Sequence, residues 1–429
     1  MRRENPGGPV TADGTKQALS AMRVLDFTQV MAGPFCSMLL GDLGADVIKI
    51  EPPEGDATRK MAGSVGMESP GYWAVNRNKR GMVLNLKDPR GQEIVRALAA
   101  RADVLVENYR PGVMAAFGLG YADLRTVNPA LIYASISGFG HTGPYAARGG
   151  FDLVAQGMSG LMSVTGELGA PPAKCGVPIT DLGAGLFALQ AILAAYIHCL
   201  RTGEGQHIDT SLLEAGVALS VWETTQYFST GEIPEPLGSA HRMFAPYQAI
   251  RCADGYITLG SANQRTWERF AQVIERSDLL RRPEYADNSQ RLRNRRQLIE
   301  EIEAVTSTYP RSHWLAVLDE AGVPCGPILN YHEVLADPHV QARGMVQEMN
   351  HPVGGRIRVL GPAAKLSETP ARLSRPAPRY GEQTAEVLRM IGYTEREIQE
   401  FAASGVVVLD PSTGVTAEAA QRPGGVARE

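Results

Sequence analysis

The sequence predicts an α/β fold with a large domain, built on a nucleotide-fold-like parallel β-sheet, and a smaller α/β domain. Three observations support this prediction. Short apolar strands alternate with helical stretches between residues 22 and 137, as in parallel sheets that helices cover on both faces. The chain has 429 residues, more than one domain usually holds. Residues 225–250 are rich in Gly, Pro and aromatic side chains and separate this half from a region of different composition.

The elements of the sheet follow from apolar runs and their boundaries. Strands are expected at 22–28, 46–51, 82–86, 103–108 and 131–137, and helices at 35–43 and 88–101. Asp88 is the expected N-cap of the second helix, with Pro89 in its first turn. In the smaller domain a strand at 255–259 precedes helices near 264–275, 291–308 and 313–321, and a last helix is expected at 384–391. Ligands of parallel sheets bind at the carboxyl ends of the strands, so the residues after each strand are binding candidates.

Composition excludes several classes of function. A formal net charge of −4 gives no basic surface for nucleic acid. The five cysteines are scattered and form no C-x-x-C pair, which argues against a disulfide framework and a structural metal site and favours the cytoplasm. The first residues contain no apolar signal segment, so residues 1–20 are expected to be a flexible tail, as are residues 406–429.

A long apolar helix is the most distinctive stretch. It is expected from Leu182 to Leu200, and Asp181 directly before it is the expected N-cap. Asp181 has two compatible roles: it satisfies free N–H groups of the first turn, or it is a nucleophile that the helix N-terminus keeps ionised, presented on Gly183 and Gly185 where a ligand can approach. Nineteen apolar residues also approach the length of a membrane span. Gln190 interrupts the run, and a helix buried in a large core is the better interpretation.

A dinucleotide site is not supported. The first strand leads into Met31-Ala32-Gly33-Pro34 in place of G-x-G-x-x-G, and Pro34 lacks an N–H for a phosphate. Gly118-Leu119-Gly120 lacks the third glycine.

Several segments in this order resemble the class III CoA-transferases, the family of the formyl-CoA:oxalate and carnitine enzymes. They are VLDFTQVMAGPFCSMLLGDLGADVIKIEPP, NRNKRGMVLNLK, DVLVENYRPGV, SGFGHTGP, GFDLVAQGMSG, ITDLGAGLFALQAILAA, RTGEGQHIDTSL and GVPCGPI, within residues 20–405. The resemblance implies an interlocked, ring-like homodimer. It also implies that residues 21–224 and a returning segment, 333–405, form the large domain, with a crossover and small domain at 225–332.

The resemblance also implies the chemistry. The family's nucleophilic aspartate corresponds to Asp181, which forms a mixed anhydride with the acyl group and then a thioester with CoA. Coenzyme A is then a co-substrate, carried as acyl-CoA, and no tightly bound cofactor is expected. The partners are acyl-CoA and a small carboxylic acid. Expected CoA contacts are Val30, Met31, Ala32, Leu84, Asn85, Leu86, Lys87, Asn108, Tyr109, Arg110, Arg148, Gly149, Gly150, Phe151 and Asp152.

The acyl pocket and two alternatives stay open. His141, Arg242 and Met243 are candidates for the pocket, and Arg242 would pair with the second carboxylate of succinate or glutarate. Met31 stands where the oxalate enzyme has a glutamine, which argues against oxalate. An α-methylacyl-CoA racemase needs a histidine where this chain has Phe151. A CoA-binding protein without catalysis is the second alternative.

Overall fold

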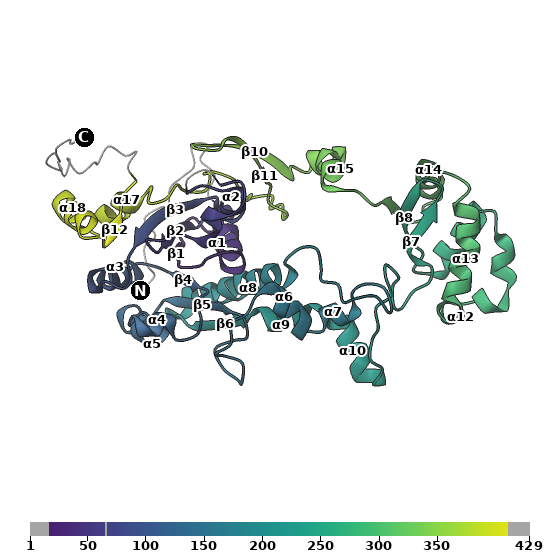
Figure 1. Cartoon of the computed structure of the whole chain (residues 1–429), viewed down its shortest axis with the longest axis horizontal. Helices are drawn as coiled ribbons and strands as arrows, with labels where there is room; N and C mark the ends of the chain where they lie inside the picture. The colour runs from purple at the N-terminus through teal and green to yellow at the C-terminus, as the bar shows by residue number, and fades with distance from the viewer. Residues whose placement is uncertain (1–16, 65–66, 411–429) are drawn as a thin grey trace, which may run out of the picture. The chain divides into compact units, whose positions relative to one another are not determined.

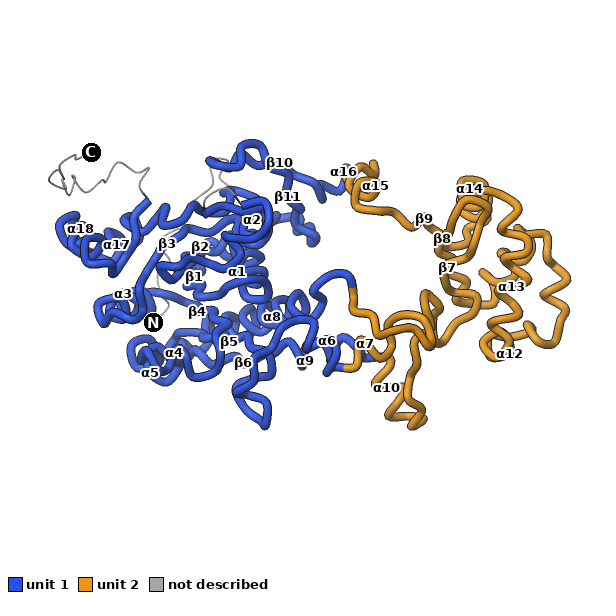
Figure 2. The backbone as a smooth tube through the Cα atoms, viewed as in Figure 1, with its two compact units in different colours: residues 1–159, 176–221, 343–429 blue, residues 160–175, 222–342 orange. Residues whose placement is uncertain are grey.

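The computed structural model describes residues 17–64 and 67–410 and divides the chain into two compact units (Figure 2). Unit 1 comprises residues 1–159, 176–221 and 343–429, and unit 2 comprises residues 160–175 and 222–342. The sequence placed the small domain between boundaries at 225 and 333, whereas the main part of unit 2 is 222–342. Residues 160–175 also belong to unit 2, and no change in composition marks this segment. Residues 1–16 and 411–429, most of the two expected tails, lie outside the described residues.

Unit 1 is built on a seven-stranded sheet of order β12-β3-β2-β1-β4-β5-β6 (Figure 1). Its neighbouring strands are parallel except for β12, which pairs antiparallel with β3. The predicted large, mainly parallel sheet is therefore confirmed. The strands are β1 Arg23–Asp26, β2 Asp46–Glu51, β3 Lys79–Leu84, β4 Val104–Glu107, β5 Ile132–Ser137, β6 His207–Ser211 and β12 Val407–Val408.

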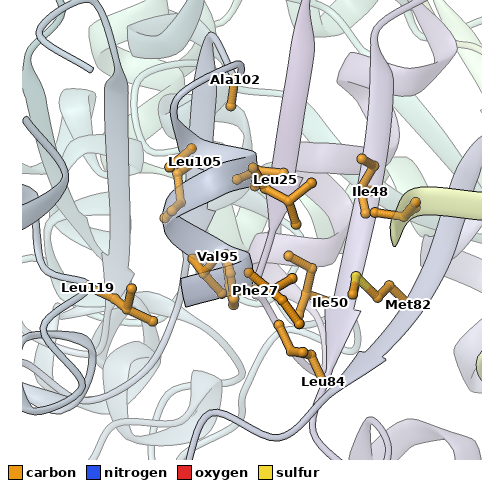
Figure 3. Packing of buried hydrophobic residues seen from close by; sticks show 14 of the residues in the cluster. Leu25, Phe27, Ile48, Ile50, Met82, Leu84, Val95, Ala102, Leu105 and Leu119 are labelled. Carbon is orange, nitrogen blue, oxygen red and sulfur yellow. The ribbon is translucent and has the colours of Figure 1, made fainter. Parts of the chain in front are cut away.

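Helices cover both faces of this sheet because its strand residues alternate between two apolar clusters. Val24 and Val47 belong to the cluster that packs on α1, α6, α8 and α9. Leu25 and Ile48 face the other cluster, in which Figure 3 shows them near Val95 of α3. The helices of unit 1 are α1 Ala32–Asp42, α2 Pro70–Asn76, α3 Pro89–Ala99, α4 Val113–Ala116, α5 Tyr121–Val127, α6 Asp152–Met158, α8 Ile179–Thr202, α9 Leu212–Leu219, α17 Thr384–Met390 and α18 Glu395–Ala403, with the 3-10 helix Ala57–Lys60 and the hairpin β10 Val346–His351 and β11 Gly355–Leu360.

Sequence reasoning placed the start of β3 too late and did not predict the strands β6 and β12, because these segments are charged, polar or very short. Strand β3 begins at Lys79 and not at Met82, because Lys79 is fully buried by an ion pair with Asp26. Strand β6 is a half-exposed edge strand with polar residues. The expected tail after residue 405 instead begins with β12, whose Val407 is buried in the core with Val406.

Unit 2 has its own core and a three-stranded antiparallel sheet of order β7-β8-β9. Trp267 and Phe270 of α11 and Trp314 of α14 are buried in that core. The elements are α7 Leu161–Val164, α10 Val221–Thr230, β7 Tyr247–Cys252, β8 Gly255–Gly260, α11 Gln264–Val273, 3-10 helices Ser277–Arg281 and Pro283–Tyr285, α12 Asn288–Arg293, α13 Arg295–Thr306, α14 Arg311–Glu320, β9 Cys325–Pro327, α15 Tyr331–Ala336 and α16 Pro338–Ala342.

Helix α8 begins earlier than the sequence predicted. It starts at Ile179 after Pro178, so Asp181 lies inside the first turn and is not the N-cap. Thr180 is buried and both its N–H and its hydroxyl donate to Asp152, which ties the early turn to α6. The expected role of the two glycines also changes. A Cβ at Gly185 would lie 2.7 Å from the carbonyl oxygen of Ala32 in α1, so this glycine permits close helix packing.

Only one face of α8 is buried, whereas the sequence favoured a fully buried helix. Ala184, Ala188 and Ile192 face the core, while Ile197 and Leu200 are 50% and 70% exposed. Within residues 17–64 and 67–410, α8 is also the one helix long and apolar enough to cross a membrane. Length and composition alone make this weak evidence, since core helices of soluble proteins pass the same test.

Two alanine substitutions in α8 separate helix packing from helix propensity. Gly185→Ala is expected to destabilise the fold by about 1–3 kcal/mol, because the new methyl meets the rigid backbone of α1. In Gly183→Ala the new methyl would lie 3.1 Å from the end of the Leu219 side chain and 3.5 Å from the Cβ of Ala215, and the substitution gains helix propensity of roughly 1 kcal/mol. Thermal unfolding of both variants checks this, and a lower melting temperature for Gly183→Ala than for Gly185→Ala contradicts it.

Candidate active site

A cavity of about 320 Å³ opens at the carboxyl ends of β1, β4 and β5, where the strand order reverses direction. Parallel sheets bind ligands at such switch points. The loop after β1 forms one wall, the loop after β4 a second, and Asp181 of α8 lies in the lining. The lining residues are Gln29, Val30, Met31, Ala32, Asn108, Tyr109, Arg110, Pro111, Ile136, Ser137, Gly138, Arg148, Gly149, Gly150, Phe151, Asp181 and Leu212.

A second cavity of about 400 Å³ shares Gln29 and Tyr109 with the first. Residues from the ends of β2 and β3 line it, among them Glu51, Pro52 and Pro53. It also contains Leu84, Asn85, Leu86 and Lys87. The two cavities share two lining residues, and their linings reach from Asp181 in the first to the exposed Lys87 in the second.

Burial and a neighbouring carboxylate shape the chemistry of Asp181. Burial, followed by the negative charge of Asp152, raises the pKa of Asp181 to about 6. The sequence suggested the opposite, a carboxylate that the helix N-terminus keeps ionised, but loss of hydration dominates here. At neutral pH most of the Asp181 carboxylate is still ionised, and it is a stronger base and nucleophile than an exposed aspartate.

Asp152 does not line the cavity, but it holds the first turn of the helix that carries Asp181. It begins α6, and its carboxylate accepts hydrogen bonds from the N–H and hydroxyl of Thr180, at 3.0 and 2.7 Å, and from Gln156, at 2.7 Å. The first turn of α8 is thereby fixed one residue before Asp181.

A close backbone contact shapes the loops opposite Asp181. A Cβ at Gly150 would lie 2.6 Å from the Cα of Gly138, so only glycine fits at these two cavity positions. Two arginines line the same wall: Arg148 stacks on Tyr145 at 4.7 Å, and Arg110 lies beside Gly149. Two cations beside one ionised carboxylate suit an anionic ligand.

The comparisons with known proteins identify the family of this chain. The profile of CoA-transferase family III matches residues 19–384. The chain belongs to this family. Succinyl-CoA:glutarate CoA-transferase of Homo sapiens is 41% identical over 94% of this chain and 92% of its own length. Succinyl-CoA:mesaconate CoA-transferase of Haloarcula marismortui is 40% identical over 87% and 96%, and acetyl-CoA:oxalate CoA-transferase of Acetobacter aceti is 37% identical over 86% and 95%.

A solved structure agrees with the fold of this CoA-transferase. A CAIB/BAIF family protein from Brucella suis has a TM-score of 0.77 and 37% identity, covering 86% of this chain and 98% of that one. The protein is therefore a family III CoA-transferase that uses CoA thioesters as co-substrates.

The structure brings most of the predicted residues of this CoA-transferase to one edge of the sheet. The expected CoA contacts other than Asp152 line the two cavities described above. Sequence reasoning did not select Pro111, Ile136, Ser137, Gly138 or Leu212 for the site, although they also line the first cavity. The available signal was their position after β4 (Pro111), at the end of β5 (Ile136, Ser137 and Gly138) and directly after β6 (Leu212). All of these ligand assignments stay predictions.

The three acyl-pocket candidates lie elsewhere. His141 does not line the Asp181 cavity: its ring lies 5.5 Å from that of His207, and its Nε2 lies 3.7 Å from the carboxylate of Glu107. Arg242 and Met243 line a separate cavity of about 150 Å³ in unit 2, where Arg242 donates to the carbonyl of Glu235 at 2.7 Å.

Sequence reasoning did not predict that Glu107, at the end of β4, is buried and has a strongly raised pKa. Burial raises its pKa to about 7, against hydrogen bonds from Ser135 and the N–H of Tyr109. This burial could not be predicted from sequence, because a glutamate at the last position of a strand is usually expected to be solvated.

Proposed function

We propose that this CoA-transferase moves CoA from succinyl-CoA to a four- or five-carbon dicarboxylic acid through covalent intermediates on Asp181. The observation that supports it best is an ionisable, half-buried carboxylate in a cavity lined by cationic side chains. The relatives support the substrate class. The acceptors in their names are glutarate, mesaconate and oxalate, which share a second carboxylate, and the acceptors of the two relatives with the more similar sequences, glutarate and mesaconate, are five-carbon acids.

The proposed reaction has four balanced steps. An oxygen of the Asp181 carboxylate attacks the thioester carbon, and the C–S bond breaks to give a mixed anhydride and CoA thiolate. The thiolate attacks the Asp181 side-chain carbon, releasing succinate and leaving an aspartyl-CoA thioester. The acceptor carboxylate attacks the same carbon and expels the thiolate, forming a second anhydride. The thiolate then attacks the acceptor carbon and frees Asp181. No net proton or electron is transferred.

The site has the features this sequence of steps requires. Covalent catalysis divides one difficult exchange into easier steps. A desolvated carboxylate with a pKa of about 6 attacks better than an ordinary aspartate. Gly138, Gly149 and Gly150 line the cavity, and their backbone N–H groups are the candidates we propose to stabilise the tetrahedral oxyanions.

A transfer assay with a panel of acids tests the substrate class. With succinyl-CoA as donor, glutarate and other four- and five-carbon dicarboxylates are expected to accept CoA with higher kcat/KM than monocarboxylates of equal length. Arg148→Ala, which removes a cation from the lining of the Asp181 cavity, is expected to reduce this preference. Arg242→Ala, at a side chain that lines a separate cavity of unit 2, and Arg296→Ala, at a 94% exposed side chain of the same unit, are expected to leave it in place. Equal turnover of both acid classes by the parent protein rules out the proposed substrate class. α-Proton exchange without transfer would instead favour a racemase, although Phe151 offers no base.

We further propose that the functional form is an interlocked homodimer. Leu186, Ile197 and Leu200 of α8 are 50–70% exposed, and Val217 and Leu219 of α9 are 47% and 42% exposed. Exposed apolar side chains that gather on a surface mark interaction sites. A second copy covers this face better than a membrane does, since α8 also buries a face in its own unit. Light scattering of the purified protein without detergent is expected to give twice the chain mass; a monomer contradicts the proposal.

A further inference from the structure

The loop between β1 and α1 has an unusual conformation where it forms the cavity wall. Gln29, Val30, Met31 and Ala32 line the cavity that contains Asp181. Val30 has a φ of 69°, a left-handed conformation that β-branched residues avoid. A conformation of this kind persists only where surrounding contacts impose it, and it is concentrated at functional sites.

Buried side chains hold the backbone of this loop at both ends. At its start, Lys49 Nζ donates to the carbonyl of Thr28 at 2.8 Å, and Asp26 accepts from the Thr28 N–H at 2.9 Å. At its end, Lys79 Nζ donates to the carbonyl of Pro34 at 3.0 Å. The loop is therefore fixed to β2 and β3 by two ammonium groups.

Further contacts fix the middle of the loop. The side-chain amide of Asn108 bonds both the N–H and the carbonyl of Gln29, each at 2.8 Å. The carboxylate of Asp56 accepts from the N–H of strained Val30 at 3.4 Å.

The two lysines are part of a closed set of buried charges. Lys79 pairs with Asp26 at 2.9 Å and Lys49 pairs with Asp56 at 2.9 Å, and all four side chains have 0% exposure. Burial works against the charge of Lys49, but Asp56 and Asp26 raise its pKa above the ordinary lysine value. Burial lowers the pKa of Lys79 to about 8, so both are charged at neutral pH. Removing one member of a pair leaves its partner as an uncompensated buried charge.

The clamped loop also contacts the helix that carries Asp181. The carbonyl oxygen of Ala32 lies against Gly185, one turn after Asp181, where a Cβ would be only 2.7 Å away. A shift of the loop therefore changes the position of α8 as well as the cavity wall.

We propose that Lys49 and Lys79 are positioning residues that clamp loop 28–34 and thereby set the distance between a bound acyl-CoA and Asp181. The inference rests on the proposed role of Asp181. Neither lysine lines the cavity, so each acts through the loop and not on the substrate. Well-packed apolar residues often replace a buried ion pair without loss of stability. We therefore assign the two lysines the role of anchoring the carbonyl oxygens of Thr28 and Pro34, and not the role of stabilising the fold.

A matched pair of substitutions on neighbouring residues tests the proposal. Lys79→Met removes the ammonium at the loop, while Arg77→Met removes a buried partner of Asp42 at the other end of α1, an ion pair of 2.6 Å. Lys79→Met is expected to lower kcat about a hundredfold, as misplacement of about 1 Å does. It is also expected to accelerate amide hydrogen exchange at residues 28–31. Arg77→Met is expected to lower the melting temperature with little change in kcat or in loop exchange.

Two further measurements keep the proposal falsifiable. If Lys79→Met does not fold, Asp56→Asn replaces it, because asparagine keeps an acceptor for Val30 while the charge that holds Lys49 is lost. Amide hydrogen exchange is also measured in an Asp181→Asn background, together with the affinity for CoA by calorimetric titration. Neither measurement depends on CoA transfer. Faster loop exchange and weaker CoA binding there support the clamp even if Asp181 is not the nucleophile. Equal kcat losses in Lys79→Met and Arg77→Met, or unchanged loop exchange, overturn it.

Discussion

Asp181→Asn is expected to lower the rate of CoA transfer by about a thousandfold or more, as the loss of other covalent nucleophiles does. The amide has nearly the shape of the carboxylate but cannot attack a thioester. Stability provides the control. Because the folded protein raises the pKa of Asp181 from 3.8 to about 6, the group favours folding fully below the lower value and loses that contribution as pH rises through 6. The variant is therefore expected to melt higher than the parent protein at pH 8.

The proposed covalent intermediate on Asp181 can be tested by mass spectrometry. Trypsin cleavage after Lys174 and Arg201 gives a peptide, residues 175–201, in which Asp181 is the one acidic residue. Hydroxylamine added during turnover converts an aspartyl-CoA thioester into a hydroxamate on Asp181. It only releases the acyl group from an adventitious thioester on Cys175 or Cys199, which adds no mass. Full activity in Asp181→Asn, or a hydroxamate on another residue, contradicts the assignment.

The pH profile of kcat/KM is expected to fall about tenfold per pH unit below a midpoint near 6, because only the ionised carboxylate is a nucleophile. Burial is the larger cause of the raised pKa and Asp152 the second. Asp152→Asn is therefore expected to move the midpoint down from 6 while leaving it above the ordinary value of 3.8.

A matched control for this profile is Asp209→Asn, which removes a carboxylate that accepts from the N–H of His141 and does not line the cavity. Its midpoint is expected to stay near that of the parent protein. A parent midpoint near 4, or an equal shift in both variants, contradicts the electrostatic account of Asp181.

The sequence predicted the sheet and the position of the site because both depend on simple patterns. Apolar runs identify β1, β2, β4 and β5, and the switch-point rule places the residues that follow them at one edge. It could not predict groups whose environment is set by distant partners. From sequence alone Lys79 would be placed on the surface, but in the structure it pairs with Asp26. Asp181 would be placed at the N-cap, but the N–H of Thr180 donates to Asp152 and the helix begins earlier. Such pairings join residues far apart in the chain, and spacing does not encode them.

The last strand of the sheet has a consequence for biosynthesis. Val387, Leu388, Val406 and Val407 complete the apolar layer over β3, although more than 300 residues separate β3 from β12 along the chain. A ribosome therefore releases the whole of unit 2 before it supplies the segment that closes unit 1. Unit 2, which has a core of its own, is free to fold first, while the exposed edge of β3 remains a point where chaperones would act on the nascent chain.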